Sequence, residues 1–491
     1  MRKLGWIGCL FLLVTSCFRP HYVRQPLDLP DAWRFDANED STLYNDSWWL
    51  QFKDPVLTNL IITALKNNQD IRVAIYRVRE FYARLGVVSA DQYPGVTGNA
   101  SYMRRKLSSE RAGEADRQAM HANSNKTRAT RIFPPFNDYQ AFLNFNWALD
   151  FWSRYYSASE AAYEDYLGTI QARRSVVITV VSSVAMTYIK LRNLDAQLLI
   201  SKQTLKSRYE SLKLAQDRFE LGETSSLEVI QAQAEIEIAA LRVIEFEREI
   251  PLAEDQLSVL LGDNPREIER GSAIQEFVYP VSIPAGLPSD LLTRRPDIVE
   301  AEDAVKAANA RVSEARALLF PQFTLTGAYG SESTQLKTFL TSPTEMWQYG
   351  VDAVQTLFDA GRILYNIEEA SAIREETLAN YRQTILKAFQ EVNDALIQVR
   401  KNKELMNEHQ QQVKILKEYL RLATLRYNEG EVDYLNVLDA ERTLFTAQLD
   451  LAQSEADSFT AIVKLYGALG GGWVDESDGI AISDIPCDTR G

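Results

Sequence analysis

The chain repeats itself at a fixed spacing of 208 residues. The run AQDRFELGE at 215–223 returns as ATLRYNEGE at 423–431, and the same spacing pairs Gly262 with Gly470 without a gap. A repeat of fixed period constrains the architecture more than any single residue, because each copy must fold into the same unit. The sequence therefore predicts a duplication of one large helical unit. A tube of equivalent staves gains from such a duplication, whereas an enzyme gains little from doubling a long polar helix pair.

Each copy contains a segment long enough for an unusually extended helix. Residues 154–221 contain no proline, which predicts a helix on the order of 100 Å long. Such a rod needs a coiled-coil or bundle partner, and after a polar turn a return helix is predicted over 227–261. The second copy is predicted to run over 361–429 and to return over 434–469. Shorter helices are predicted over 54–90 and 297–319, each followed by an aromatic–proline pair.

Ahead of each long helix the hydrophobic period changes to two, which is typical of a β-strand. Within 139–151, Leu143, Phe145 and Trp147 alternate with polar or small residues. A segment of about 10 residues with this alternation fits a membrane strand with lipid on one side and water on the other. A half-buried strand of a soluble sheet shows the same alternation, so the pattern leaves both interpretations open. Four strands are predicted, over 96–103, 139–151, 323–329 and 347–357.

Four strands are too few to close a membrane barrel, because single-chain barrels need about eight. Open strand edges also cannot face lipid, where their backbone groups would lack hydrogen-bond partners. A membrane barrel must therefore be completed by further copies of the chain. Two copies would supply about eight strands and three about twelve, which are both closed sizes, and the strand count does not choose between them.

The N-terminus resembles a bacterial lipoprotein signal. Arg2 and Lys3 precede an apolar run at 4–14 that is too short to span a bilayer and suits a secretory signal. The run ends in the sequence Val-Thr-Ser before Cys17, which predicts removal of residues 1–16. A diacylglyceryl and an acyl group would then be carried by Cys17. An ordinary signal peptide that happens to contain a cysteine is the alternative.

The composition excludes several classes of function. The formal charge of −14 argues against nucleic acid, because phosphate binding needs a basic face. The three histidines are scattered without metal-ligand spacing, and we find no nucleophile–base set and no phosphate loop. The sequence thus predicts no enzyme, no metal and no cofactor beyond the N-terminal lipid. The most apolar later segment, 176–189, is too short to cross a membrane and is predicted to be the core part of a long helix.

Several runs resemble the outer-membrane efflux channels. WWLQFKDPVL at 48–57 looks like the start of the mature channels, and LPSDLLTRRPDI at 287–298 resembles a motif of their lipoprotein (NodT-type) branch. ALGGGW at 468–473 matches the usual end of the helical domain. With both repeat copies, the resemblance covers about residues 17–475. It implies a mainly α, TolC-like fold with four β-strands and long antiparallel helical hairpins per chain. Three copies would form a 12-strand outer-membrane β-barrel continued by an α-helical barrel.

The resemblance also implies function and partners. A homotrimer in the outer membrane of a Gram-negative-type bacterium would be a passive exit duct for drugs, toxic compounds or metal ions. Its partners would be a periplasmic adaptor (membrane fusion protein), an inner-membrane transporter of the RND type and outer-membrane lipid. A channel for type I protein secretion is the alternative within this class, and a periplasmic coiled-coil adaptor or structural lipoprotein is the alternative in another class. The sequence leaves the exported substrate open.

The resemblance places a periplasmic gate near the second helix turn. Asp439 matches an aspartate of the family's gate-forming segment, and Tyr427 matches a tyrosine that braces its closed state. Asn436 stands where some members carry a second aspartate, and Val432 where some carry a bracing arginine. The alternative is that Asp439 lies on a solvated helix face.

The two turns are predicted to be the periplasmic tips that contact the adaptor. Chain reversal alone is the plain alternative, with glycine supplying the positive φ that a helix end needs. The residues concerned are Gly222, Glu223, Thr224 and Ser225 in the first turn and Gly430, Glu431, Val432 and Asp433 in the second.

Other distinctive residues are predicted to be structural. Trp48 and Trp49 would anchor the N-terminal arm, while Arg294 and Arg295 would pair with acidic groups. Pro296 and Asp297 suit the first turn of a helix. The predicted organisation is a signal peptide 1–16, an extended arm 17–55, a first repeat 56–262, an equatorial connector 263–295, a second repeat 296–470 and a C-terminal tail 471–491.

Overall fold

The computed structural model describes residues 23–24, 30, 33–34, 47–106, 135–278 and 288–471. The predicted signal peptide, the lipidation site Cys17 and most of the predicted arm lie outside the described residues, as does the predicted tail beyond Gly471. The chain divides into two compact units. The first unit takes its described residues from 1–23, 82–164 and 306–376, and the second from 24–81, 165–305 and 377–491.

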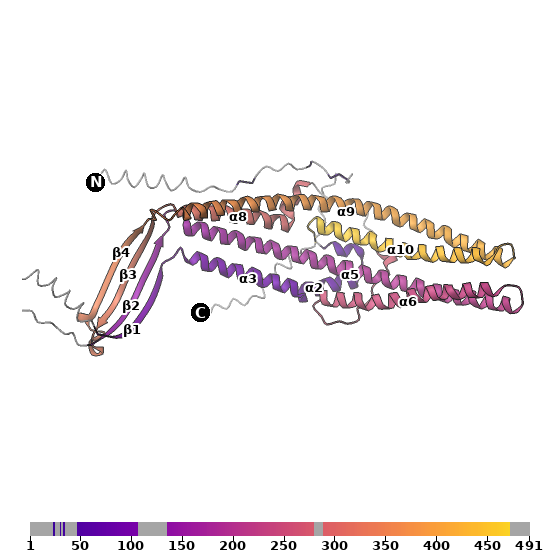
Figure 1. The fold of residues 1–491 in the computed structure, drawn as a ribbon, viewed down its shortest axis with the longest axis horizontal. Helices are drawn as coiled ribbons and strands as arrows, with labels where there is room; N and C mark the ends of the chain where they lie inside the picture. Colours follow the sequence, from indigo (N-terminus) through magenta and orange to yellow (C-terminus); the bar gives the residue numbers. More distant parts are fainter. Residues whose placement is uncertain are drawn as a thin grey trace, which may run out of the picture. The chain divides into compact units, whose positions relative to one another are not determined.

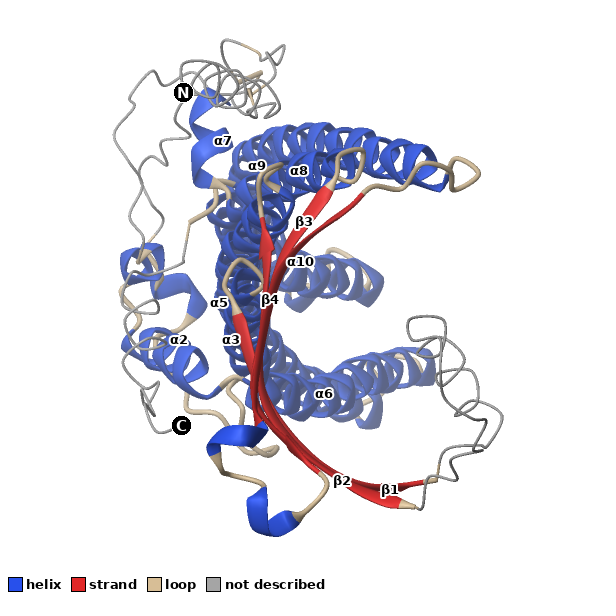
Figure 2. Ribbon diagram, turned by 90° about the vertical axis from the view of Figure 1, so that its left-hand side faces the viewer, coloured by secondary structure: helices blue, strands red, loops and turns tan. Residues whose placement is uncertain are grey.

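The first unit holds a four-stranded antiparallel sheet in the order β1-β2-β3-β4 (Figure 1). Figure 2 shows the strands as one curved layer. All four predicted strands are present, with bounds a few residues from the expected ones. The first hairpin and the second are therefore joined directly, through β2 and β3. The strands are β1 (Gly95–Arg105), β2 (Phe136–Leu149), β3 (Gln322–Ser333) and β4 (Glu345–Val354).

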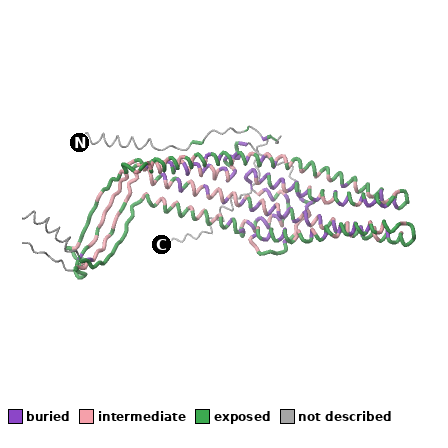
Figure 3. The backbone as a smooth tube through the Cα atoms, viewed as in Figure 1, coloured by how far each residue is buried: buried purple, intermediate pink, exposed green. Residues whose placement is uncertain are grey.

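The two faces of the sheet differ in chemistry. The register places Leu143 opposite Tyr329 and Tyr329 opposite Trp347, so one face carries a row of large apolar side chains. On the other face, Asn144 of β2 and Gln348 of β4 are both paired with Ala328 of β3. Figure 3 shows strand residues mostly as intermediate or exposed, and Trp347 is 65% exposed. Within the described part of the chain, this apolar face is thus left largely uncovered.

Two long helical hairpins repeat with matching lengths. The outgoing helices α5 (Arg154–Glu220) and α9 (Arg362–Asn428) both have 67 residues. The return helices α6 (Ser226–Leu260) and α10 (Tyr434–Ala468) both have 35. Each return helix runs back beside its outgoing helix (Figure 1). The predicted bounds of all four helices are confirmed to within one or two residues.

The turn of each hairpin is closed by a glycine in the left-handed region. Gly222 has φ of 74° and Gly430 has φ of 77°. After each glycine, the next N–H donates to a carbonyl five residues earlier, a pattern that satisfies the last carbonyls of a helix. The donors and acceptors are Glu223 with Arg218 and Glu431 with Arg426, at 2.9 Å in both turns.

The expectation of one unbroken helix over 54–90 is wrong. The segment forms α2 (Pro55–Asn67) and α3 (Gln69–Ala90), separated at Asn68. The Asn68 side-chain oxygen accepts hydrogen bonds from the N–H groups of Asp70 at 2.9 Å and Ile71 at 3.1 Å. Asparagine is a favoured N-cap, so it starts a new helix here instead of continuing the first.

The break at Asn68 is part of a junction that both halves contain. The Asn68 side-chain amide donates to the carbonyl of Leu260 at the end of α6, at 2.8 Å. Arg295 occupies the equivalent place before α8 (Pro296–Ala317) and donates to the carbonyl of Ala468 at the end of α10, also at 2.8 Å. Both α3 and α8 have 22 residues. Each return helix is therefore tied to the start of the helix that leads toward the sheet strands in sequence.

The core of the second unit surrounds Trp48. Its ring is fully buried and stacks on Tyr466 with centroids 5.3 Å apart. The middle of α5 supplies Val181, Val184 and Ile189 to the same core, as predicted for the apolar segment 176–189. In the described part of the chain, α5 is also the one helix long and apolar enough to cross a membrane by length and composition, a test that a core helix passes as well.

We expect Gly262→Ala to destabilise the protein much more than Gly222→Ala. Both glycines have positive φ, which costs an alanine about 1 kcal/mol. A Cβ at Gly262 would also lie 2.3 Å from the carbonyl oxygen of Asn67, whereas one at Gly222 would meet open space. Thermal unfolding followed by circular dichroism should show a loss of roughly 3 kcal/mol or more for Gly262→Ala and about 1 kcal/mol for the control. Equal losses of stability in the two variants would contradict the close approach of Gly262 to Asn67.

Candidate functional site

The two hairpin turns present similar exposed surfaces. In the first turn Gly222, Glu223 and Ser225 are exposed, while Thr224 is half-buried. In the second turn Val432 is half-buried, while Gly430, Glu431 and Asp433 are exposed. The glutamate of each turn pairs with an arginine of the preceding helix, which stiffens the turn and leaves its surface open. The pairs are Arg218 with Glu223 at 3.5 Å and Arg426 with Glu431 at 3.0 Å.

Tyr427 joins the second hairpin to the first. Its hydroxyl donates to Glu228 Oε2 at 2.9 Å, across 199 residues of sequence. The Arg218 guanidinium lies 4.6 Å from the centre of the tyrosine ring, a favourable cation–π distance. Burial and the neighbouring Glu228 carboxylate raise the pKa of Tyr427, while Arg218 lowers it. The tyrosine therefore stays a neutral hydrogen-bond donor that holds the two hairpins together.

Asp439 and Asn436 lie apart from that contact. Both are exposed on α10, and their spacing of three places them on one side of the helix. Asp439 accepts a hydrogen bond from the Tyr419 hydroxyl at 3.3 Å, and the Asn436 amide donates to the carbonyl of Asp433 at 3.3 Å. The structure thus separates the predicted gate residues into a buried contact at Tyr427 and an exposed polar face at Asn436 and Asp439.

A buried ionic cluster that no local sequence pattern predicts lies near these residues. The side chains of Arg208 and Glu235 are 2% and 1% exposed, with Nη2 and Oε2 3.1 Å apart. Arg442 of α10 pairs with the other oxygen of the same carboxylate. The one sequence signal is a failure of the repeat, because the equivalent positions carry no charge: they are Leu416, Thr443 and Ala234.

The predicted structural residues all lie in the second unit. Trp48 and Trp49 are buried, with their rings 5.8 Å apart at 80°. Arg295 pairs with Asp297 at 2.6 Å and with Glu391 at 2.8 Å, as expected for an arginine that meets acidic groups. Pro296 opens α8, and burial lowers the pKa of Arg294 to about 10.

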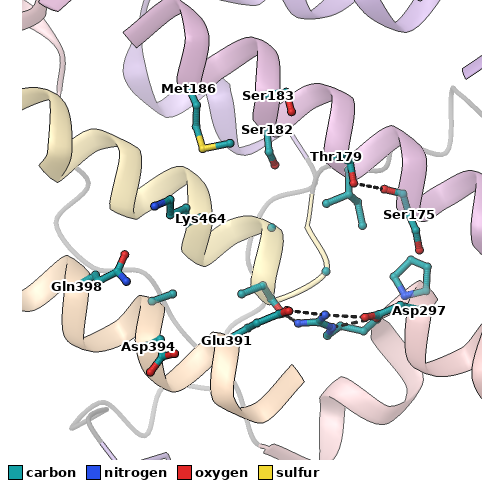
Figure 4. Close-up of a pocket in the computed structure, with 17 residues that line it drawn as sticks. Ser175, Thr179, Ser182, Ser183, Met186, Asp297, Glu391, Asp394, Gln398 and Lys464 are labelled. Carbon is teal, nitrogen blue, oxygen red and sulfur yellow. Dashed lines mark hydrogen bonds and ion pairs between the residues drawn. The ribbon is translucent and has the colours of Figure 1, made fainter. Parts of the chain in front are cut away.

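A hollow of about 480 Å³ lies beside the second junction (Figure 4). It is bordered by Ser175 and Thr179 of α5 and by Glu391 and Asp394 of α9. Lys464 of α10 adds a positive charge, so the lining carries both signs. Among the described residues, no group of three or more His, Cys, Asp or Glu side chains is placed to hold a metal ion. The hollow therefore places charged side chains of both signs next to Arg295.

Comparison with known sequences shows similarity over nearly the whole chain. The model of the family described as outer membrane efflux protein matches it twice, at 60–263 and 287–471. The cation efflux system protein CusC of Escherichia coli is 32% identical over 470 residues, covering 95% of this chain and 98% of its own. The toluene efflux pump outer membrane protein TtgC of Pseudomonas putida is 34% identical over 440 residues, covering 89% and 87%. The probable outer membrane lipoprotein SilC of Salmonella typhimurium is 32% identical over 485 residues, covering 96% and 99%.

Solved structures give the same result for the fold. A crystal structure of CusC superimposes with a TM-score of 0.81 at 30% identity, covering 92% of this chain and 99% of the other. The outer-membrane channel OprN gives a TM-score of 0.84 at 27% identity, covering 93% and 99%. These similarities confirm the expected mainly α fold with its small four-stranded sheet.

The stability difference between the wild type and Glu441→Gln should depend on pH. Ser211 donates to Glu441 Oε1 at 3.1 Å, yet burial raises the pKa of this carboxyl above its ordinary value of 4.5. The folded chain therefore holds the proton more tightly than the unfolded chain, and the wild type loses stability as pH rises from 4.5 through the folded pKa. Unfolding measured from pH 4 to 8 should show that the variant becomes more stable relative to the wild type as pH rises. A constant difference would contradict the raised pKa.

Proposed function

Because this chain belongs to the outer membrane efflux protein family, we propose that it forms the exit duct of a tripartite efflux pump. The partners would be a periplasmic adaptor and an inner-membrane transporter of the RND type. The chain is an outer-membrane efflux channel and not an enzyme. The observation that carries the proposal is similarity to efflux channels over both halves of the chain, including the sheet and the two long hairpins.

A homotrimer is supported by surfaces that a single chain leaves uncovered. The sheet has two open edges, β1 and β4, and open edges cannot face lipid because their backbone groups would go unpaired. Three chains would close these edges and turn the apolar face around Trp347 toward lipid. Several large apolar side chains in the second unit are also exposed on single helices and would pack between chains. They include Leu241 and Ile244 of α6 and Leu405, Ile415 and Leu422 of α9.

The cargo is proposed as small molecules. CusC is named for cations, TtgC for toluene and ArpC for antibiotics, at similar identities of 32% and 34%. These names favour efflux of drugs, toxic compounds or metal ions over the protein-secretion alternative. The spread of cargo at nearly equal identity also suggests that the inner-membrane transporter, and not the duct, selects the molecule.

Lipid anchoring at Cys17 is part of the proposal. The sequence before this cysteine has the pattern of a lipoprotein signal, and the similar protein SilC is named an outer membrane lipoprotein. Cleavage ahead of Cys17 and acylation would place the mature N-terminus in lipid. The anchor would complement the apolar face of the sheet.

The exposed turns are proposed to bind the adaptor. Both turns end 67-residue helices, and both expose a glycine and a glutamate at equivalent places. Equivalent turns in three chains would present six similar contacts to an adaptor ring. The positive φ of Gly222 and Gly430 serves chain reversal in either case.

The gate is proposed to lie just inside those turns. Tyr427 would brace the closed state through Glu228, and Asp439 and Asn436 would form the polar face along the narrowed path. Opening would then require the second hairpin to move away from the first.

Replacing Tyr427 by phenylalanine should raise single-channel conductance in planar bilayers. The change removes the hydroxyl that donates to Glu228 and weakens the closed state by on the order of 1 kcal/mol. Tyr434→Phe is the matched control, because that buried hydroxyl has no hydrogen-bond partner among the described residues. Asp439→Ala should reduce block by divalent cations. Identical conductance in Tyr427→Phe, Tyr434→Phe and the wild type would reject the brace.

Deleting the gene should make its native host more sensitive to the compounds that its pump exports. Cells without the exit duct should accumulate a fluorescent efflux substrate, and the wild-type chain should restore export. A variant with the turn residues Glu223 and Glu431 both changed to lysine should reach the outer membrane without restoring export. Unchanged sensitivity across metals, dyes, solvents and antibiotics would count against efflux.

A further inference from the structure

We propose that Glu235 is a positioning residue for the gate, acting through Arg442 to fix the helix that carries Asp439. The inference rests on the proposed gate. Glu235 belongs to α6 of the first hairpin and Arg442 to α10 of the second, and the two side chains form an ion pair. Arg442 follows Asp439 by three positions, which places the two on one side of the helix. Holding Arg442 therefore fixes how Asp439 is presented.

Arg208 of the first hairpin holds the Glu235 carboxylate that Arg442 meets. Arg208 of α5 donates to the backbone carbonyl of Glu235 and pairs with its carboxylate. Its guanidinium also lies 5.1 Å from the ring centre of Phe445 on α10. Because Arg208 and Glu235 are 2% and 1% exposed, each side chain balances the buried charge of the other, and Arg442 adds a second cation at the same carboxylate.

Of the three side chains in the cluster, that of Arg442 can separate from the others most easily. Its side chain is 52% exposed, so its guanidinium can move into water without leaving a buried charge behind. Glu235 would remain paired with Arg208. A charge-assisted hydrogen bond in a buried setting is stronger than a neutral one, so this contact resists separation of the hairpins independently of Tyr427.

The positions that the repeat makes equivalent to this cluster cannot form a second one. The positions equivalent to Arg208, Glu235 and Arg442 are Leu416, Thr443 and Ala234. The contact can therefore form at only one of the two quasi-equivalent hairpin pairings. Within one chain, the contact therefore adds to Tyr427 in holding the second hairpin against the first.

Arg442→Gln tests the proposal without stranding a buried charge. The open-to-closed ratio in bilayer recordings should rise on the order of tenfold, the effect expected from losing one charge-assisted hydrogen bond. Block by a divalent cation should weaken as well, because Asp439 loses its fixed position. Arg442→Lys should restore part of both properties.

Arg242→Gln is the matched control. Arg242 is 50% exposed and pairs with Glu245 on its own helix, at 2.7 Å, so the same substitution removes a similar surface charge without touching the second hairpin. Wild-type behaviour is expected for this control, with similar melting temperatures for both variants. Equal effects of the two substitutions, or none from Arg442→Gln, would overturn the proposal.

Combining the substitution with Tyr427→Phe separates this inference from the gate itself. Independent contacts that hold the same closed state should multiply the two effects on the open-to-closed ratio. A response to Tyr427→Phe without any response to Arg442→Gln would reject the role of Glu235 and keep the gate. A protein that forms no conducting channel would instead reject the proposed function.

Discussion

The contact between the end of each return helix and the start of the next helix sets the geometry of this chain. At Gly262 the backbone approaches the Asn67 carbonyl so closely that a Cβ would lie 2.3 Å from the oxygen. Gly470 approaches Arg294 and Arg295 less closely, with a Cβ 3.2 Å from the nearest side-chain atom. From each of these points a 22-residue helix leads to the strands and a 35-residue helix leads to the turn. A fixed joint therefore gives both halves the same dimensions.

Periodicity and the repeat predicted most of the fold. The long helices and four strands could be read from the sequence because their patterns are local: 67 residues without proline for α5, and alternating side chains for β2. The break between α2 and α3 at Asn68 was not predicted, because asparagine is not a strong helix breaker. Its role depends on the Leu260 carbonyl, which lies 192 residues away in sequence.

The candidate site was less accessible to sequence reasoning. Resemblance to efflux channels singled out Tyr427 and Asp439, but the partner of Tyr427, Glu228, is 199 residues away. The cluster of Arg208, Glu235 and Arg442 joins residues that no local pattern connects, and each looks like an ordinary surface charge in the sequence. Departure from the repeat was the signal available, since all three equivalent positions are uncharged. The repeat thus builds two equivalent hairpins, and its exceptions mark the contacts that join one hairpin to the other.

The central claim is that four strands and two hairpins per chain are one third of a closed duct. Native mass spectrometry of the protein extracted from outer membranes in mild detergent tests this most directly. The account predicts a particle of three chains, each lacking residues 1–16 and carrying lipid at Cys17. A single chain or a pair would contradict it. The open edges of β1 and β4 would then have to be closed without the third chain that the account requires.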